Sequence, residues 1–373
     1  MRIMRVDLEP IVMRKEDPKW RFALGANPLT EGVVVTLAAD TGARGYGYAS
    51  ATPHMGATRE SLIVALERFK PLLLGRDPFA IEETLMLLDR DLDGNNQAKA
   101  GIDCALYDLI GRALGQPICN LLGGKVRDSV PILRILAIKA PDEMAAQAEK
   151  LVAAGYRYLK IKVQGEVEED VARVRAIRQQ VGDAIHLTID ANQSYSVKDA
   201  VAVLNRMAEF DIDLAEQPVA AGDLAGLKLV TESVPVTVEA DETADSVARV
   251  MELVAHRIVD AISLKIPKLG GIRNTLAAAR ICEAGHVQYR MGAAVGSRLL
   301  SAHAMHLTAA LKEIDYACEL GEFERLLDDP FEGIAIENGR LRLPEGAGSG
   351  VSLRQASEVS TGWRRSHAQP AGS

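Results

Sequence analysis

Charged side chains recur along this chain at a nearly constant interval, each at the end of a short apolar segment. Lys162, Asp190, Glu216, Asp241 and Lys265 follow one another at gaps of 28, 26, 25 and 24 positions. Each gap has room for one strand and one helix, which predicts successive βα units and a parallel sheet. In a closed barrel these strand ends meet on one rim, where such barrels place their active sites. A doubly wound open sheet is the alternative, but it would not bring five charged groups to one point.

The apolar segments predict enough strands to close an α/β barrel of the TIM type. They lie near Val130–Ala137, Tyr158–Val163, His186–Asn192, Asp213–Pro218, Val236–Asp241, Ala261–Pro267, Val287–Met291 and Tyr316–Leu320.

The N-terminal third has a different pattern. Strands are expected near residues 2–12, 32–37 and 40–48, and helices from about Arg59 to Leu122. We therefore predict an α+β capping domain over residues 1–125, joined by part of a C-terminal segment at about 340–363. The barrel would span 126–339, and the polar residues 364–373 would form a flexible tail.

Composition narrows the function. The 373 residues carry a net charge of −8, which disfavours nucleic acid and anionic membranes as partners. The first residues lack an apolar core, and no run of 18 apolar residues occurs, so we expect a cytoplasmic protein. The four cysteines are widely spaced, as expected for buried thiols in a reducing compartment.

Two lysines, Lys160 and Lys162, fall on the same face of one strand because strand side chains alternate. A solvent-facing edge strand would explain them equally well in isolation. Inside a parallel barrel both faces of the sheet are buried, and a buried ammonium group needs an ionic partner or a catalytic role.

The carboxylates of Asp190, Glu216 and Asp241 would repel one another on one rim. Each alone could be a helix N-cap, but three in register indicate a hard divalent cation, magnesium or alternatively manganese. Glu239 shares the strand face of Asp241, so periodicity leaves open which of the two is a ligand.

Lys265 lies about opposite Lys162 in such a barrel. Neighbouring ammonium groups should lower its pKa and make it a base near neutral pH. Glu242 is expected to orient Lys265 from behind, and Lys268 to mark the turn into the next helix.

Together these segments resemble the enolase superfamily, in its muconate-lactonizing-enzyme subgroup. The resemblance rests on an ordered set of motifs: Ala98-Lys99-Ala100-Gly101-Ile102-Asp103, Leu121-Leu122-Gly123-Gly124, Lys160-x-Lys162, Asp190-Ala191-Asn192, Glu216-Gln217-Pro218, Ala240-Asp241-Glu242 and Lys265 before Gly270-Gly271.

The resemblance implies a (β/α)7β-type modified TIM barrel with an α+β capping domain. It implies that Asp190, Glu216 and Asp241 bind Mg²⁺, with Asn192 and Glu242 behind them. Lys160 and the metal would stabilise an enediolate, and Lys162 and Lys265 would act on opposite faces of the α-carbon of a small carboxylate substrate. A homo-oligomer is also expected.

Substrate choice is less constrained. The seventh strand lacks the histidine of the related mandelate-racemase subgroup, and His303 and His306 read as packed helix residues. Tyr48 stands where relatives usually have glutamate. Glu319 resembles the acidic residue of cycloisomerases, whereas the Asp-x-Asp of dipeptide epimerases is missing, so dipeptides are disfavoured. Loops carrying Trp20, Arg21 and His54 should close over the ligand, with Arg21 a candidate for a distal anion.

These features favour a racemase, epimerase or cycloisomerase acting through an enediolate. β-Elimination on the same site, a Schiff-base aldolase and a non-catalytic carboxylate-binding protein are the alternatives.

Overall fold

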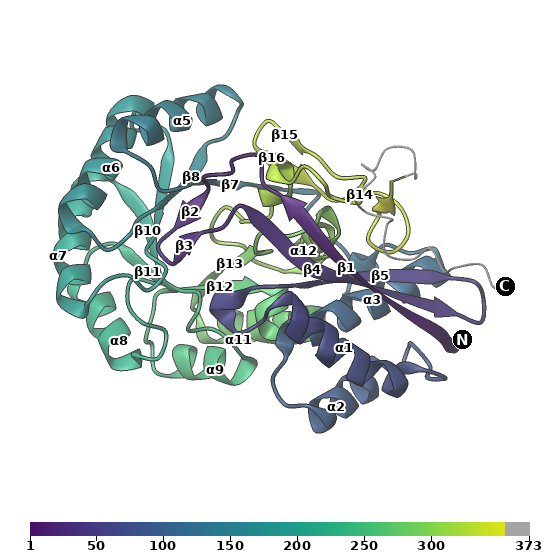
Figure 1. Cartoon of the computed structure of the whole chain (residues 1–373). Coiled ribbons are helices and arrows are strands. Elements are labelled where there is room, and N and C mark those ends of the chain that lie inside the picture. Colours follow the sequence, from purple (N-terminus) through teal and green to yellow (C-terminus); the bar gives the residue numbers. More distant parts are fainter. Residues whose placement is uncertain (355–373) are drawn as a thin grey trace.

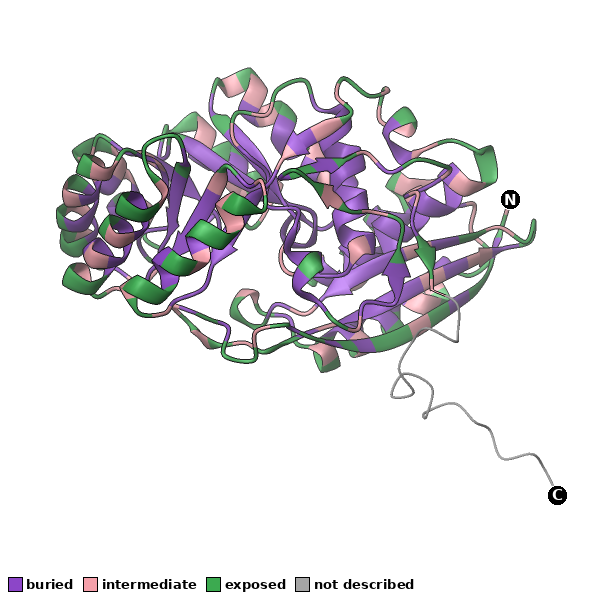
Figure 2. Cartoon of the chain, turned by 90° about the horizontal axis from the view of Figure 1, so that it is seen from above, coloured by how far each residue is buried: buried purple, intermediate pink, exposed green. Residues whose placement is uncertain are grey.

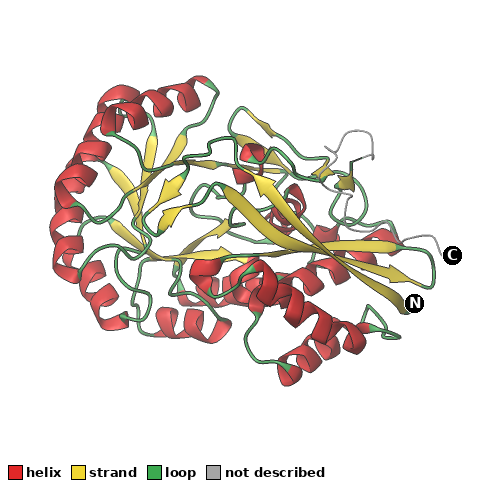
Figure 3. Ribbon diagram, in the orientation of Figure 1, coloured by secondary structure: helices red, strands yellow, loops and turns green. Residues whose placement is uncertain are grey.

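The computed structural model of the protein describes residues 1–354. A curled parallel sheet lies inside an arc of helices, and a second, N-terminal layer of strands and helices packs beside it (Figure 1, Figure 3). None of the helices in residues 1–354 combines the length and apolarity that a membrane span requires. The predicted tail at 364–373, and residues 355–363 of the predicted C-terminal segment, lie outside the described residues.

The barrel sheet has seven parallel strands in sequential order. They are β7 (Leu133–Leu136), β8 (Tyr158–Lys162), β9 (His186–Asp190), β10 (Ile212–Glu216), β11 (Thr237–Ala240), β12 (Ala261–Lys265) and β13 (Gln288–Gly292).

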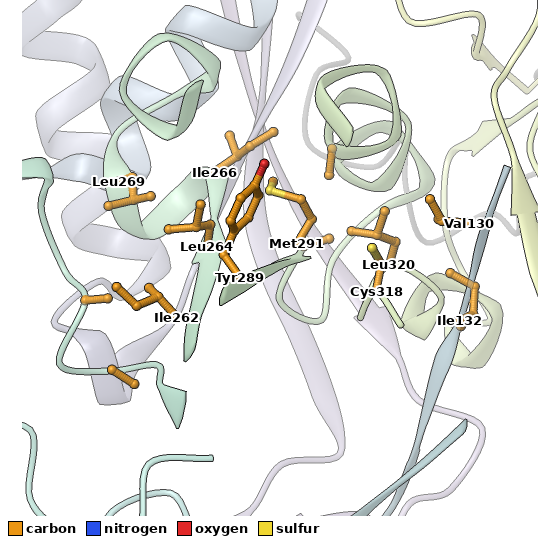
Figure 4. Packing of buried hydrophobic residues seen from close by; sticks show 14 of the residues in the cluster. Val130, Ile132, Ile262, Leu264, Ile266, Leu269, Tyr289, Met291, Cys318 and Leu320 are labelled. Atoms are coloured by element: carbon orange, nitrogen blue, oxygen red, sulfur yellow. The ribbon is translucent and has the colours of Figure 1, made fainter. Parts of the chain in front are cut away.

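The predicted eighth strand differs from the expectation. Residues near 318 form no ladder, but Cys318 bridges Ile132 and Glu319 bridges Gly292, both in parallel. Figure 4 shows Cys318 and Leu320 lying between Met291 and Ile132. The segment therefore closes the gap between β13 and the first barrel strand with two single bridges. The predicted first strand is also divided, into β6 (Ser129–Pro131) and β7.

Helices cover the outer face of the sheet, and buried residues concentrate between the two layers (Figure 2). They are α5 (Pro141–Ala153), α6 (Val167–Val181), α7 (Val197–Met207), α8 (Leu224–Ser233), α9 (Val247–Ala255), α10 (Ile266–Leu269), α11 (Ile272–Gly285) and α12 (Arg298–Ala310). Side chains cap four of these starts: Ser196, Asp223, Ser246 and Ser297 each accept a backbone N–H of the first turn. These caps help end each strand–helix loop at a defined residue.

The N-terminal part is an antiparallel sheet in the order β1–β4–β5 with helices on one side. Its elements are β1 (Ile3–Arg14), β4 (Leu29–Ala39), β5 (Arg44–Ser50), α1 (Arg59–Leu73), α2 (Ile81–Asp91), α3 (Asn96–Leu114) and α4 (Ile118–Leu121). A short hairpin, β2 (Arg21–Phe22) with β3 (Gly25–Ala26), was not predicted.

Close packing of α3 on β5 requires glycine. A Cβ on Gly47 would lie 1.9 Å from the carbonyl oxygen of Gly101, which no side chain permits. On the barrel side, the carboxylate of Asp103 accepts the backbone N–H of Ile272, at the start of α11. Helix α3 thus connects the N-terminal sheet to the barrel.

The C-terminal segment returns to both regions. Short strands β14 (Phe331–Glu332) and β17 (Ser352–Leu353) pair with each other, and β15 (Ile336–Glu337) and β16 (Arg340–Arg342) add to β6. Near the end, Arg112 of α3 donates to the carbonyl of Val351 at 2.7 Å.

Candidate active site

The recurring charged residues meet at the carboxyl ends of the barrel strands. In the ladder register Lys162 is opposite Asp190, Asp190 is opposite Glu216, and Glu216 is opposite Glu239. Asp241 follows β11 directly, and Lys265 is the last residue of β12. The spacing in the sequence therefore does bring these side chains to one rim.

Lys160 lies deepest and is fully buried. Its Nζ is 2.9 Å from Asp190 Oδ2 and 2.7 Å from Glu216 Oε2, and it also donates to Glu319. Burial opposes the charge of this ammonium, but the carboxylates outweigh burial and raise the pKa of Lys160 well above its usual value. Lys160 is therefore a permanent cation at the floor of the site.

Lys162 also contacts the carboxylate of Asp190. Its Nζ donates to Asp190 Oδ2 at 2.5 Å and to Asn192 Oδ1 at 2.8 Å. Asn192 in turn donates to Glu242 at 3.0 Å. Within residues 1–354 the hydrogen bond of Glu242 thus goes to Asn192, so the expectation that Glu242 orients Lys265 is wrong: it supports Lys162 through Asn192.

The backbone near Asn192 is unusual. Asn192 and Gln217, each shortly after a barrel strand, have φ values of 40°, a left-handed conformation that non-glycine residues seldom adopt. The side chain of Gln217 accepts the backbone N–H of Asp241 at 3.0 Å. Strain of this kind is commonly held at functional sites, where surrounding contacts fix it.

Lys265 faces the site from β12, and Asp241 holds it at 2.6 Å through Oδ2. A Cβ on Gly292 would lie 2.8 Å from Lys265 Cε, so this glycine makes room for the lysine. Burial lowers the pKa of Lys265, but Asp241, Glu319 and Glu216 together outweigh burial and raise it. The predicted lowering of this pKa is therefore wrong for the structure, because ion pairing dominates over the neighbouring ammonium groups.

Lys268 was expected only to mark the turn into the next helix, but it also contacts Asp241. It is buried, and its Nζ donates to Asp241 Oδ1 at 2.7 Å and to the carbonyl of Ser263 at 2.8 Å. These bonds fix the Asp241 carboxylate from the side opposite Lys265.

Arg290 of β13 was missed from the sequence. It is buried, donates to Glu239 through Nε at 2.8 Å and through Nη2 at 2.6 Å, and also donates to Glu216. Arg290 therefore pairs with both Glu239 and Glu216, and the choice of Asp241 over Glu239 as a metal ligand stays a prediction of the family resemblance. The alternation that selected Lys160 and Lys162 also places Arg290 on the inner face of β13, so the signal was present.

The carboxylates fit a hard cation in chemical type, although their oxygens are engaged by lysines. In residues 1–354 no group of three or more acidic, histidine or cysteine side chains converges as a ready ligand set. Glu216 nevertheless keeps one buried oxygen, Oε1, without a hydrogen-bond partner. Burial and the nearby Asp190 raise its pKa well above the usual value. A carboxylate oxygen without a partner is the type of ligand that a hard divalent cation prefers, so Glu216 would fit such a metal in chemical type.

A cavity of about 370 Å³ opens above these groups. Lys162, Asn192, Asp241, Lys265 and Glu319 line its deep end, and Trp20 and His54 line its outer wall. Arg21 is exposed and lies off this wall, because strand alternation in β2 buries Trp20 and Phe22 on either side of it. The structure does not place the predicted distal-anion residue at the cavity.

Other predicted residues have packing roles. His303 is buried, with Nδ1 2.7 Å from the carbonyl oxygen of Leu299 and Nε2 3.1 Å from that of Cys104. Tyr48 is buried, off the cavity wall, and donates to the carbonyl of Glu31 at 2.9 Å. All four cysteines are free and buried, as expected.

Comparisons with known proteins identify the family. Residues 10–123 match the mandelate racemase / muconate lactonizing enzyme N-terminal domain, and residues 143–357 match the enolase C-terminal domain-like family. The chain belongs to the mandelate racemase/muconate lactonizing enzyme family, within the enolase superfamily.

Relatives in this family include a hydrophobic dipeptide epimerase of Enterococcus faecalis, 36% identical over 89% of this chain and 94% of the relative. A chloromuconate cycloisomerase of Delftia acidovorans is 35% identical over 79% of this chain and 80% of its own. The crystal structure of the N-succinyl Arg/Lys racemase of Bacillus cereus superposes with a TM-score of 0.92 at 28% identity, covering 95% of this chain and 96% of that one. The fold is the barrel of this family, and the protein is an enzyme of the isomerase class.

Proposed function

We propose that the protein is a Mg²⁺-dependent racemase or epimerase that removes and replaces the proton next to a substrate carboxylate. The observation that carries this proposal is the placement of Lys162 and Lys265 on the same cavity. They end strands β8 and β12, which are four positions apart in the sheet and so stand across the barrel from each other. A substrate between them presents one face of its α-carbon to each lysine.

Asp190, Glu216 and Asp241 are the residues that would hold the metal. When bound, it would neutralise these acids and stabilise negative charge on the substrate carboxylate. Because the same acids now raise the pKa of Lys265, sharing their charge with a cation would lower it toward the range of a base.

The substrate and the two lysines account for every proton and electron pair in this transfer. The C–H bond breaks as a neutral lysine takes the proton, and the electron pair moves onto the carboxylate as an enediolate. Lys160 at the floor of the site stabilises the added charge. The ammonium on the opposite face then donates its proton to the α-carbon, which inverts the centre.

Cycloisomerisation is a second candidate, because Glu319 at the cavity wall resembles the acid of cycloisomerases and one lysine suffices as its proton donor or acceptor. A homo-oligomer stays a prediction of the family resemblance.

The test is a panel of N-acylamino acids, dipeptides, proline derivatives and muconates in deuterated water. Exchange at the α-carbon is followed by mass spectrometry with Mg²⁺ and then with EDTA. EDTA-sensitive exchange is the expected result. Exchange that persists in EDTA would contradict the metal-dependent step, and its absence from the whole panel would count against proton abstraction.

A further inference from the structure

The wall of the active-site cavity changes character from its deep end to its mouth. The lysines and most of the carboxylates of the lining lie on the rim of the barrel strands, whereas Asn27, Glu31 and His54 are polar residues of the N-terminal part. The outer wall comes mainly from residues of the N-terminal part. It includes Trp20, Phe22, Leu24, Leu29 and Met55. A substrate held by its carboxylate at the deep end would therefore place its other end against apolar side chains.

Two leucines at the mouth are unusually open. Leu24 is 51% and Leu29 is 42% exposed, although both line the cavity. Ile135 of β7 and Phe22 continue the same surface inward, where both are buried. Covering this surface with an apolar substituent would remove it from water, which favours binding by roughly 25 cal/mol per Å².

Among the N-terminal residues that line the cavity, Glu31 and His54 are titratable. Glu31 lines the cavity but pairs with Arg59 at 2.9 Å. His54 lies on the outer wall, where desolvation of its ring, followed by the effect of the Lys265 ammonium, lowers its pKa to about 4. It is neutral at pH 7.

Two cations of the N-terminal part, Arg21 and Lys15, are directed away from the cavity. Arg21 is exposed and off the wall. Lys15 packs over the Trp20 ring at 4.3 Å from its centre, and its ammonium donates to the carbonyl of Asn27 at 2.5 Å. Neither is positioned to bind an anion in the cavity.

Glu319 on the cavity wall already pairs with a buried lysine through one of its two oxygens. Although burial favours its neutral form, Lys160 and then Lys265 lower its pKa to about 2, so it is a carboxylate already matched by Lys160. A free ammonium entering beside it would compete with a buried lysine.

We propose that this cavity selects a monocarboxylate whose remaining part is uncharged and apolar, such as the N-acyl derivative of an apolar amino acid. The inference rests on the proposed function and adds that a second carboxylate and a free ammonium are both disfavoured. Leu24 and Leu29 are its specificity-determining residues. This differs from the diacid or dipeptide substrates that the names of the relatives would suggest.

Three matched compounds test the proposal. N-propionyl-leucine, alanyl-leucine and N-succinyl-leucine share the leucine carboxylate and differ in a neutral, cationic or anionic end. With Mg²⁺ in deuterated water, we expect N-propionyl-leucine to exchange its α-proton with a kcat/KM at least about tenfold above either other compound, because an unpaired charge against an apolar wall is costly.

A gain-of-function variant sharpens the test. Leu29→Arg adds a cation to an exposed position of the wall and should lower KM for N-succinyl-leucine about tenfold or more while raising it for N-propionyl-leucine. The control is Leu229→Arg on α8, since Leu229 is also exposed, at 53%, but lies off the cavity. It should leave both values unchanged.

The outcomes separate this inference from the proposed function. Equal or faster exchange of the succinyl or alanyl compound by the wild-type enzyme overturns the selectivity while leaving proton abstraction intact. If no compound exchanges, calorimetric binding to the wild-type enzyme with Mg²⁺ decides. Preferential binding of N-propionyl-leucine upholds the selectivity without the reaction, and absence of that preference overturns it.

Discussion

The deep end of the cavity is lined mainly by charged side chains, whereas its mouth is lined mainly by apolar ones. At the deep end, Lys160, Lys162 and Lys265 are buried against carboxylates, and the contacts are short and charged. At the mouth, residues of the N-terminal part present apolar side chains, with Leu24 and Leu29 open to solvent. If the proposed function is right, this difference means that the barrel residues carry out the reaction and the N-terminal residues select the substrate.

The largest expected effect is at the deep end. Replacing Lys162 or Lys265 with alanine should lower kcat for racemisation by about 10² to 10⁴, the usual contribution of a general acid or base. Polarimetry on a substrate found in the exchange panel measures it. The control is Lys228→Ala, an exposed lysine of α8 that pairs with Glu232 at 3.9 Å and should retain full activity. If kcat of either variant falls by less than tenfold, that lysine is not a general acid or base in the reaction.

A second large effect is expected below the rim. Arg290→Met leaves Glu216 and Glu239 as buried carboxylates without their guanidinium, which should cost about 3 to 5 kcal/mol of unfolding free energy. Denaturant unfolding measures it. Arg206→Met breaks an exposed pair with Glu168 and should leave the free energy of unfolding nearly unchanged, because exposed pairs stabilise little. Similar values for the two variants would show that the Arg290 cluster does not stabilise the barrel.

The stability contributed by Asp103, which connects α3 to the start of α11, should depend on pH. Burial raises the pKa of Asp103 to about 7, above its usual value, despite the N–H of Ile272 that it accepts. The folded protein then keeps this proton while the unfolded chain loses it, so stability from this group is greatest below about pH 4 and falls as pH rises to 7. Asp103→Asn should flatten this slope in unfolding titrations. Asp93→Asn, at an exposed site, should not. An unchanged slope in both would contradict the raised pKa.

The smallest effect is expected at Arg21. Because this side chain lies outside the cavity, Arg21→Ala should change KM by less than about twofold for monoacids and diacids alike. A selective rise in KM for diacids would restore the original prediction of a distal-anion site and would break the contrast between the charged end and the apolar mouth.

Much of this arrangement follows from periodicity. The spacing of Lys162, Asp190 and Lys265 predicted which strand ends would meet, because parallel strands share one direction and side chains alternate. Periodicity does not give the partner of a side chain, since that depends on cross-strand register and side-chain length. The Asn192–Glu242 bond was misassigned for this reason, whereas Arg290 was overlooked although strand alternation places it on the inner face of β13. The direction of the Lys265 pKa shift was wrong because its nearest neighbour proved to be Asp241.

The outer wall of the cavity was harder to predict from the sequence. Trp20 and His54 do line the cavity as predicted, but the short β2–β3 hairpin that turns Arg21 away has only two residues in each strand. A periodic signal cannot be read from so short a segment. Likewise, the segment around Cys318 looks like a strand in sequence, yet it closes the barrel by isolated bridges.

The most direct test of the account is α-proton exchange from each enantiomer of a substrate by the single variants Lys162→Ala and Lys265→Ala, in deuterated water with Mg²⁺. We predict that each variant loses exchange from one enantiomer and keeps exchange from the other, and that the two variants lose opposite enantiomers. If either variant still exchanges both enantiomers, or if both variants lose the same one, the two-sided lysine site is wrong.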